Sequence, residues 1–193
     1  MKETNVKNEP VKNYSDSELI ALHLQGRDDA FVELYERHKR RLYGFLNALL
    51  PWAPDEVDDI FQKTWLKVLK NLPGYEEQGY FSAWLFRVGR NILIDHQRSK
   101  GRGAAMVPLD DGDSPEYGGS DNEPWREMAD ADRQRLLRRA MESLPPEQRE
   151  VVNLRNEGKS FKEIAAIQNC PLNTALARMQ YALKNLKGLI ANE

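Results

Sequence analysis

The stretch F-K-E-I-A-A-I-Q-N-C-P-L-N-T-A-L-A-R-M-Q, residues 161–180, decides the fold class of the C-terminal part of the chain. Ser160, just before it, and Glu163 have the spacing of a capping box, which marks a helix start. Asn169 falls where a tight turn needs a left-handed backbone, which Asn tolerates better than most residues. Ala165 is small enough for two helices to cross closely. The stretch therefore predicts two short helices joined by a turn, a shape that many proteins use to place a helix in the DNA major groove.

The residues around this stretch extend the helical pattern into a domain over residues 133–190. Pro145 and Pro146 stand at a helix start, and Gly158 stands at the end of the helix that follows. The last helix is expected to face the core with Leu172, Ala175, Met179, Leu183 and Leu186.

A second helical domain is predicted over residues 15–100. Ser15 and Glu18 repeat the capping-box spacing, apolar residues recur at steps of three and four, and Pro51 and Pro73 interrupt the pattern. One helix is expected to bury Val57, Ile60, Phe61, Thr64, Trp65, Val68, Leu69 and Leu72, and the next to bury Phe81, Trp84, Leu85, Val88 and Ile92. No segment alternates like a strand, so the expected fold class is all-α, with an N-terminal helical bundle and a C-terminal helix-turn-helix domain.

Residues 101–132 differ in composition from both domains. They are rich in Gly, Pro and Ser, and between residues 109 and 132 nine acidic residues stand against Arg126 alone. Such a segment buries too little apolar surface to offset the entropy lost on ordering it. We therefore expect a flexible acidic linker between the two domains.

The composition limits the classes of function. Of the 193 residues, 40% are hydrophobic and 30% are charged, and the formal net charge of -2 argues against a polycationic DNA coat. No apolar run reaches the roughly 18 residues of a membrane span, and the polar N-terminus does not resemble a signal peptide. The single cysteine, Cys170, fits a reducing compartment, so we expect a cytoplasmic protein without membrane insertion of its own. The three histidines are scattered and no Gly-rich phosphate loop is found, so we expect no metal, no cofactor and no enzymatic activity.

Two helix surfaces are candidates for binding. A basic arc lies opposite the apolar face of residues 81–98, and its cations and amide suit contacts to phosphates and base edges: Arg87, Arg90, Asn91 and Arg98. On the preceding helix, one strip combines polar groups with a leucine: Asp59, Gln62, Lys63 and Leu66. The arc is either a nucleic-acid surface or a solvated charged face, and the strip is either a protein docking site or ordinary surface.

Three segments together resemble a known family. V-D-D-I-F-Q-K-T-W-L-K-V (57–68), F-S-A-W-L-F-R-V-G-R-N-I-L-I-D-H-Q-R (81–98) and L-P-P-E-Q-R-E-V-V-N-L-R (144–155), followed by the helix-turn-helix, are similar to bacterial sigma factors. The type is the extracytoplasmic-function (ECF) group of the sigma-70 family. The resemblance covers residues 15–186, with the acidic linker as the variable part.

The resemblance implies a function, partners and sites. The protein would direct core RNA polymerase, through its β′ and β subunits, to promoter DNA, under the control of an anti-sigma factor and without a cofactor. In the family, the Asp-x-x-Gln helix docks on a coiled coil of β′, which implies a polymerase-binding role for the strip Asp59, Gln62, Lys63 and Leu66. The loop at 71–80 would capture a flipped base of the minus-ten element, with Tyr75 and Tyr80 as stacking surfaces and the basic arc holding the melted strand. Trp84 is expected to belong to the core. The helix-turn-helix would bind the minus-35 element through Lys162, Asn173, Thr174, Arg178, Gln180 and Lys184.

The second helix of this unit departs from the family. The usual pattern is Gly-Thr-Val-Lys-Ser-Arg, of which N-T-A-L-A-R (173–178) keeps only Thr174 and Arg178. Positions 181, 183 and 185 also lack the usual basic residues, and the cations that remain nearby are Lys159, Lys162, Lys184 and Lys187. Because each lost phosphate contact weakens DNA binding, two other functions stay open. One is a sigma-like module that titrates an anti-sigma factor, with Leu176 in its interface, and the other is a stand-alone helix-turn-helix transcriptional regulator.

Overall fold

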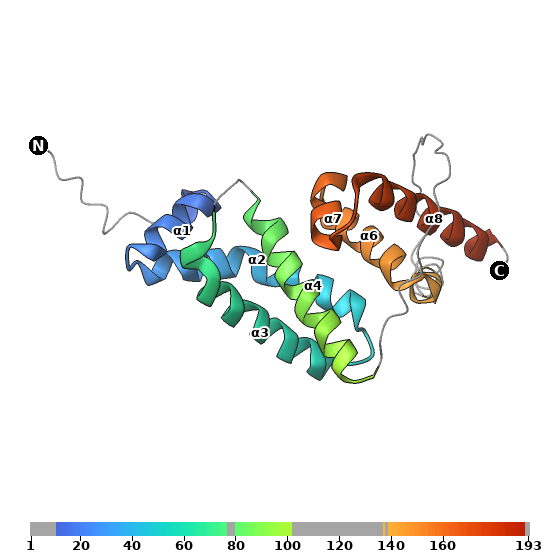
Figure 1. The fold of residues 1–193 in the computed structure, drawn as a ribbon, viewed down its shortest axis with the longest axis horizontal. Coiled ribbons are helices and arrows are strands. Elements are labelled where there is room, and N and C mark those ends of the chain that lie inside the picture. Colours follow the sequence, from blue (N-terminus) through green and yellow to red (C-terminus); the bar gives the residue numbers. More distant parts are fainter. Residues whose placement is uncertain (1–10, 77–79, 102–136, 138, 192–193) are drawn as a thin grey trace, which may run out of the picture. The chain divides into compact units, whose positions relative to one another are not determined.

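The computed structural model describes residues 11–76, 80–101, 137 and 139–191. The chain divides into two compact units, residues 1–103 and 104–193, which are described separately. Every regular element among the described residues is a helix (Figure 1), so the prediction of an all-α fold with two helical domains is confirmed. The predicted acidic linker, residues 101–132, lies outside the described residues except for Gly101.

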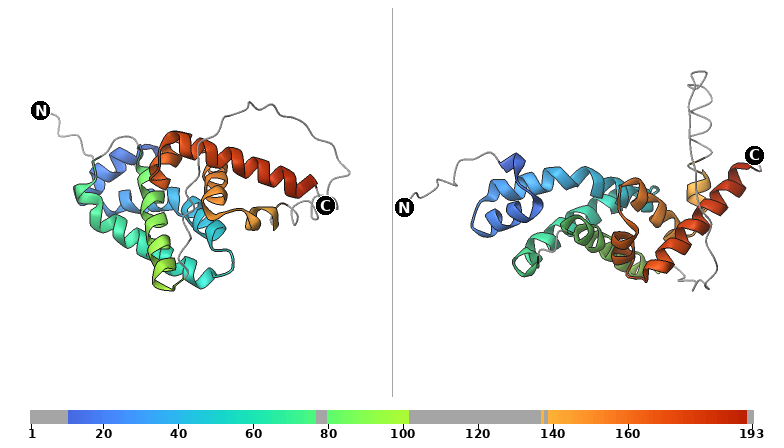
Figure 2. Two further views of the ribbon diagram at one scale, coloured as in Figure 1. Left: turned by 45° about the vertical axis from the view of Figure 1, so that its right-hand side comes forward. Right: turned by 90° about the horizontal axis from the view of Figure 1, so that it is seen from above.

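The first unit is built from α1 (Asp16–Leu24), α2 (Asp28–Leu49), α3 (Pro54–Asn71) and α4 (Phe81–Ser99), with short 3-10 turns at Val11–Asn13 and Leu72–Gly74. The long helix α2 contacts the other three helices, and α3 and α4 pack side by side (Figures 1 and 2). At the start of α1 the Ser15 hydroxyl accepts from the Glu18 amide, and the Glu18 carboxylate accepts from the Ser15 amide at 2.7 Å. The predicted capping box is therefore confirmed.

The core of the first unit is closely packed where α4 crosses α2 and α3. The rings of Phe45 and Phe86, both fully buried, lie with their centroids 5.1 Å apart. Gly89 of α4 leaves little space, because a Cβ atom there would lie 3.2 Å from Leu42 Cδ1 and 3.4 Å from Thr64 Oγ1. The buried Thr64 hydroxyl donates to a carbonyl one turn earlier in its own helix at 2.7 Å, so its polar atom is satisfied.

The buried faces of α3 and α4 differ from the prediction at four residues, one of which is Phe61 of α3, predicted to be buried and found half-buried. Leu69, predicted to be buried in α3, is 40% exposed. Trp84 and Ile92, predicted to be core residues of α4, are half-buried, whereas Phe86 and Leu93 are buried. The reason is that α4 packs on two helices at once, so its buried face is rotated toward Phe86 from the face that the apolar pattern alone indicated.

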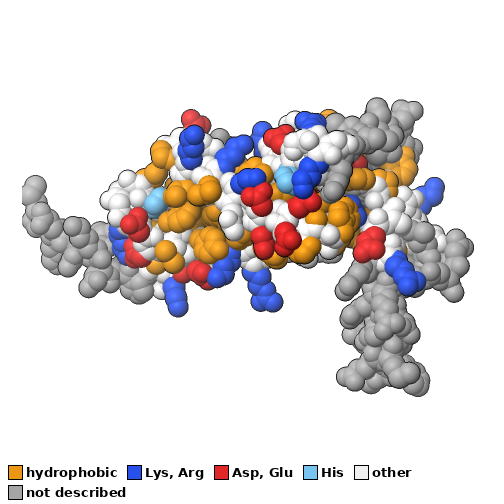
Figure 3. All heavy atoms as spheres, turned by 90° about the horizontal axis from the view of Figure 1, so that it is seen from below, with side chains coloured by type: hydrophobic (Ala, Val, Ile, Leu, Met, Phe, Trp, Pro, Cys, Tyr) orange, Lys and Arg blue, Asp and Glu red, His pale blue; other side chains and the backbone are white. Residues whose placement is uncertain are grey.

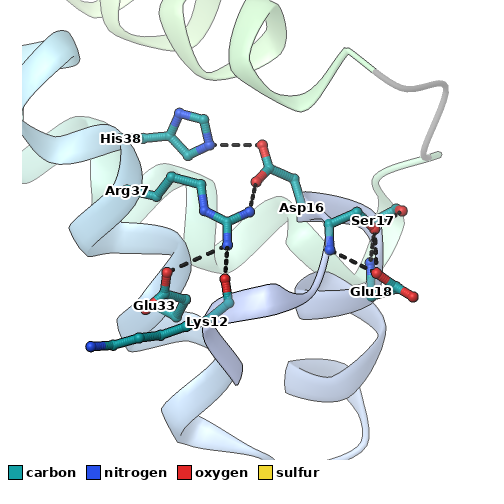
Figure 4. A network of polar contacts seen from close by, with 8 residues as sticks. Lys12, Asp16, Ser17, Glu18, Glu33, Arg37 and His38 are labelled. Atoms are coloured by element: carbon teal, nitrogen blue, oxygen red, sulfur yellow. Dashed lines mark hydrogen bonds and ion pairs between the residues drawn. The ribbon is translucent and has the colours of Figure 1, made fainter. Parts of the chain in front are cut away.

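A polar network ties the start of α1 to α2 (Figure 4). One carboxylate oxygen of Asp16 accepts from Arg37 Nη1 at 2.7 Å, and the other lies 2.7 Å from His38 Nε2. Arg37 Nη2 also donates to Glu33 and to the carbonyl of Lys12, both at 3.4 Å. Burial alone would raise the pKa of Asp16, but its contacts with His38 and Arg37 outweigh that effect and hold the pKa below its ordinary value.

The second unit is built from α6 (Pro146–Asn156), α7 (Phe161–Gln168) and α8 (Leu172–Ala191), preceded by a helical segment that ends at residue 143. The helix α8 packs on both α6 and α7, and α6 and α7 pack on each other. Their shared core is made by Val151, Leu154, Ile164, Ile167 and Ala175, all fully buried.

The turn between α7 and α8 has the predicted geometry. Ser160 and Glu163 form a capping box at the start of α7, with the Ser160 amide donating to the Glu163 carboxylate at 2.8 Å. Asn169 ends α7 in the left-handed region, with φ 52° and ψ 51°, and Ala165 is buried where the helices meet. Both local predictions for this turn are confirmed.

The inner face of α8 was only partly predicted. Ala175 is fully buried and Leu186 is buried, but Leu172 is 47% exposed and Leu183 is 38% exposed. Ala182 takes the central place instead, since it lies seven residues, or about two helical turns, after Ala175. The two alanines thus define the buried face of α8, and Leu172 and Leu183 lie outside it.

Candidate functional site

The strip predicted on α3 is exposed along its whole length. Asp59, Gln62, Lys63 and Leu66 all have exposed side chains, and 68% of Leu66 is accessible to solvent. Lys63 forms an ion pair with Asp59 one turn away. Figure 3 shows apolar side chains lying among charged ones on one face of the molecule. A leucine exposed to this degree among polar groups is typical of a surface that binds protein.

The exposed surface extends from α3 toward α2, which the sequence patterns do not indicate. Leu69 is exposed beside the strip, and Tyr43 of α2, 36% exposed, donates from its hydroxyl to Asp58 at 2.8 Å. This hydrogen bond raises the pKa of Tyr43. The two residues are fifteen positions apart in the chain, so only the pairing of α2 with α3 brings them together. An edge-to-face row of rings from both helices runs beside them: Tyr43, Phe61, Tyr35 and Trp65.

Aromatic rings also cluster where α4 begins. The Tyr75 ring lies 4.6 Å from the Trp84 ring, tilted by 35°, and 5.8 Å from the Phe81 ring. Tyr80 directly precedes α4 and is 51% exposed. The structure thus brings the two predicted stacking tyrosines to the first turn of α4, with Tyr75 packed on Trp84 and Tyr80 open to solvent. Residues 77–79 lie outside the described residues.

The basic arc predicted on α4 faces solvent at three of its four positions. Arg87, Asn91 and Arg98 are exposed, and Arg90 is half-buried. Eleven residues separate Arg87 from Arg98, so the arc is about 16 Å long, which matches roughly five nucleotides of a stacked strand. The arc therefore has the length and charge to follow a short piece of a nucleic-acid backbone.

The C-terminal end of α4 is anchored to the first turn of α3. His96 Nε2 lies 2.8 Å from Glu56 Oε2, and Lys100 Nζ lies 2.9 Å from Glu56 Oε1. Lys100, which continues the arc in the sequence, is therefore paired within the unit. Both contacts hold the last turn of α4, which carries Arg98.

The residues predicted to contact DNA in the helix-turn-helix lie mostly at the surface. Lys162 of α7 and Asn173 and Lys184 of α8 are exposed, and Thr174 and Gln180 of α8 are half-buried. Asn173 and Lys184 point away from the buried alanine face, since eleven residues correspond to about three helical turns. The structure therefore groups these two side chains on the outward face of α8.

Other polar residues of this unit are used inside it. Arg178 is half-buried, and its Nη1 donates to Gln168 Oε1 at 2.9 Å. Asn185, which replaces a usual basic residue, donates from Nδ2 to Gln148 Oε1 of α6 at 2.9 Å. Lys159, which the sequence adds to the basic surface, lies between α6 and α7 and is only 6% exposed. The exposed basic surface near α8 is therefore smaller than the sequence predicts.

The described residues hold no cluster of His, Cys, Asp or Glu that could bind a metal ion. Within the same ranges, no helix is both long and apolar enough to cross a bilayer.

Both units match models of one protein family. Residues 34–103 match Sigma-70 region 2, and residues 134–186 match Sigma-70, region 4. Together the matched segments make up more than half of the chain, and each falls on one of the two helical units. The chain therefore belongs to the sigma-70 family of RNA polymerase sigma factors.

Sequence relatives narrow the group. The ECF RNA polymerase sigma-E factor of Escherichia coli (strain K12) is 27% identical over 171 residues, which are 86% of this chain and 88% of the relative. The ECF RNA polymerase sigma-E factor of Haemophilus influenzae is 23% identical over 186 residues, which are 93% of this chain and 97% of the relative. The protein is an ECF-type sigma factor, as the resemblance in its sequence predicted.

Two solved structures share the fold. CnrH, in complex with the cytosolic domain of CnrY, has a TM-score of 0.67 and 24% identity, and the match covers 92% of this chain and 98% of that chain. The sigma factor RpoE in complex with the anti-sigma factor NepR from Bartonella quintana has a TM-score of 0.62 and 23% identity, over 83% of this chain and 96% of that chain. At these identities the likeness concerns the fold alone.

Proposed function

We propose that this sigma factor directs core RNA polymerase to specific promoters by binding polymerase, the minus-ten element and the minus-35 element at three separate surfaces. One chain combines a region 2 unit that exposes a mixed polar and apolar strip on α3 with a region 4 unit that carries a helix-turn-helix. That combination carries the proposal, because a regulator that binds DNA alone needs no such strip.

The polymerase-binding surface is the α3 strip of Asp59, Gln62, Lys63 and Leu66, docking on the coiled coil of the β′ subunit. Its exposed leucine gives an interface core, and the charged and amide groups around it give a polar rim. Leu69 and Tyr43 are exposed beside the strip and widen the apolar part of the surface.

The minus-ten surface combines the start of α4 with its basic arc. Tyr80 is exposed next to the Tyr75–Trp84 stack, so an unstacked base has a ring on which to rest. From there the arc leads along α4, and its side chains would hold the phosphates of the melted strand: Arg87, Arg90, Asn91 and Arg98.

The minus-35 surface is the helix-turn-helix. On α8 it comprises Asn173, Thr174, Arg178, Gln180 and Lys184, and on α7 it adds Lys162. With so few exposed cations, this unit alone would bind DNA weakly, since affinity for the phosphate backbone grows with the number of charges neutralised. Promoter binding therefore depends on polymerase to supply further contacts and to hold both units on one DNA molecule.

We infer that an anti-sigma factor controls this protein. The inference is supported by the two solved neighbours, of which one is a complex with the cytosolic domain of CnrY and the other a complex with the anti-sigma factor NepR. A partner that covers the α3 strip would shield its exposed Leu66 and block polymerase binding at the same time. A purified partner of this kind should abolish promoter-specific transcription when added at an equal concentration.

Run-off transcription tests the proposed function. Purified core RNA polymerase is given fragments of the source genome with and without this protein, and the transcripts are mapped. New, discrete start sites are expected only when the protein is present. Binding to the same DNA as tightly in the absence of polymerase as in its presence would favour a stand-alone regulator, and binding to an anti-sigma factor without any polymerase binding would favour a titrating module.

The surface on α3 is tested by the double substitution Asp59→Ala with Gln62→Ala. Its matched control is Asp28→Ala with Asn47→Ala, which also removes one exposed carboxylate and one exposed amide but lies on α2. We expect the α3 pair to weaken binding to core polymerase at least tenfold and the α2 pair to leave it unchanged, because central interface residues dominate binding energy. Equal binding by both double variants would contradict the assignment of the strip.

A further inference from the structure

Gln168, the last residue of α7, is a buried polar side chain at the junction of all three helices of the second unit. Only 4% of it is exposed. Its Nε2 donates to the carbonyl of Glu147 at 3.0 Å and to the carboxylate of Glu150 at 2.9 Å, both on α6. Its Oε1 accepts from Arg178 Nη1 of α8 at 2.9 Å. One amide therefore connects α6, α7 and α8.

These contacts permit a single orientation of the Gln168 amide. Both hydrogens of Nε2 have an oxygen acceptor on α6, and Oε1 has a guanidinium donor on α8. Turning the amide over would place Oε1 against two oxygens and the NH2 group against a cation, so all three hydrogen bonds would be lost. Glu150, itself only 4% exposed, thus determines together with the Glu147 carbonyl which way Gln168 faces Arg178.

Arg178 is held by this amide before any DNA is bound. Its Nη1 donates to Gln168 and its Nε is enclosed in the unit, so the plane of the guanidinium is fixed relative to α8. An arginine recognises phosphates and guanine edges through the geometry of its planar fork. When the fork is already oriented, binding costs less conformational entropy than it does for a freely rotating side chain.

We propose that Gln168 is a positioning residue for promoter recognition, which orients the Arg178 guanidinium toward the minus-35 element and is oriented in turn by Glu150. This inference rests on the proposed contact of Arg178 with DNA. It explains why the chain retains Arg178 while neighbouring positions of the family pattern are altered: the side chain has both a DNA-facing role and an internal partner on α7.

The test is a double-mutant cycle on promoter binding by the reconstituted holoenzyme, using the promoter identified by run-off transcription. The variants are Gln168→Leu, Arg178→Ala and the two together. We expect Gln168→Leu to weaken binding by about three- to tenfold, the cost of ordering one long side chain at an interface. In the Arg178→Ala background the same substitution should have no further effect, because Gln168 would act only through Arg178.

Gln148→Leu is the matched control. Gln148 is also a buried amide of this unit, 5% exposed, and it bonds α8 through Asn185 rather than through Arg178. It should lower the thermal stability of the unit, and any effect on promoter binding should be equal in the wild-type and Arg178→Ala backgrounds. If Gln168→Leu does not fold at the assay temperature, Glu150→Gln replaces it, since that change keeps the side-chain volume and removes the charge of the carboxylate that accepts from Gln168.

Two results would overturn the inference, and they differ in what else they affect. Equal losses from Gln168→Leu in both backgrounds would show that Gln168 has only a structural role, and the contact of Arg178 with DNA would stand. No loss of promoter binding from Arg178→Ala alone would remove that contact and this inference together.

Discussion

Replacing Gly89 with valine tests how tightly α4, the helix that carries the basic arc, is packed on its neighbours. A Cβ atom at Gly89 would lie 3.2 Å from Leu42 Cδ1 and 3.4 Å from Thr64 Oγ1. The contact with Leu42 is shorter than an ordinary van der Waals contact. The end of the leucine side chain must therefore shift by a few tenths of an ångström, which it can do. The two methyl groups of valine extend further into the same crossing, where the core has no spare volume.

Gly44 of α2 provides the reference for this substitution. It also lies within a helix of the first unit, but a Cβ atom there would meet nothing within 4 Å. Replacing a helical glycine with alanine raises the free energy of unfolding by about 1 kcal/mol, and replacing it with valine raises it by a few tenths of that amount. The reason is that the substituted chain loses less entropy on folding. This gain is common to both positions, so the difference between the two valine variants measures packing alone.

The two valine substitutions are expected to change the free energy of unfolding in opposite directions. Gly44→Val should raise the free energy of unfolding slightly, whereas Gly89→Val should lower it by about 1–3 kcal/mol, the usual cost of overpacking a core. For a unit of this size that corresponds to a fall of roughly 5–20 °C in the melting temperature. Gly89→Ala should fall between them and lie close to the wild type, because its helix gain offsets the displacement of Leu42.

Thermal unfolding followed by tryptophan fluorescence measures this difference, since three of the four tryptophans, Trp52, Trp65 and Trp84, belong to the first unit. Minus-ten binding should fall with stability in Gly89→Val, because a displaced α4 moves the basic arc. Equal melting temperatures for Gly44→Val and Gly89→Val would refute the argument that α4 crosses its neighbours without free space.

Further predictions concern the polar contacts of both units. Asp16→Asn should lower the free energy of unfolding by about 1–2 kcal/mol at neutral pH, because it removes the charge that holds Arg37 and His38. Since the folded-state pKa of Asp16 lies below its ordinary value of 3.8, the charged carboxylate stabilises the fold above that pH. This contribution disappears as the pH falls through the folded-state pKa of Asp16. The free energies of unfolding of the variant and the wild type, measured with urea, should therefore converge at low pH. A difference that stays constant with pH would contradict the prediction. Asn169→Val should destabilise the second unit by about 1–2 kcal/mol while Asn169→Gly is tolerated, because only the β-branched residue resists the left-handed backbone; equal melting curves would argue against that geometry. Ser160→Ala should cost about 1 kcal/mol in the same melt through loss of the capping box, and an unchanged melting temperature would show that the cap is dispensable.

Local patterns in the sequence predict the local structure well. The two capping boxes and the left-handed Asn169 each depend on a few neighbouring residues, and the structure contains all three as expected. The exposure of the α3 strip follows from helical periodicity in the same way. These features need no knowledge of the other helices.

Features that depend on the pairing of helices could not be predicted in this way. The buried face of α4 is set by its simultaneous contact with α2 and α3. As a result Phe86 is buried, whereas Trp84, which the pattern predicts in the core, is half-buried. The bond between Tyr43 and Asp58 and the role of Gln168 likewise join residues of different helices. The sequence also does not show whether a charged side chain is accessible to DNA. Lys159, which counts as a cation in the sequence, is buried.

The small number of exposed cations among the described residues of the helix-turn-helix has a consequence for how promoter binding responds to salt. Each cation that contacts a phosphate releases counterions and steepens the dependence of affinity on salt by about 0.9 in the logarithmic slope. On and beside its two helices, Lys162, Lys184 and Lys187 are exposed, whereas Lys159 is buried and Arg178 donates a hydrogen bond to Gln168. Free protein should therefore show weak DNA binding with a shallow salt slope, and holoenzyme should show a much steeper one. Because the formal net charge of the chain is -2, we also expect the free protein to have little non-specific attraction to DNA before it binds polymerase.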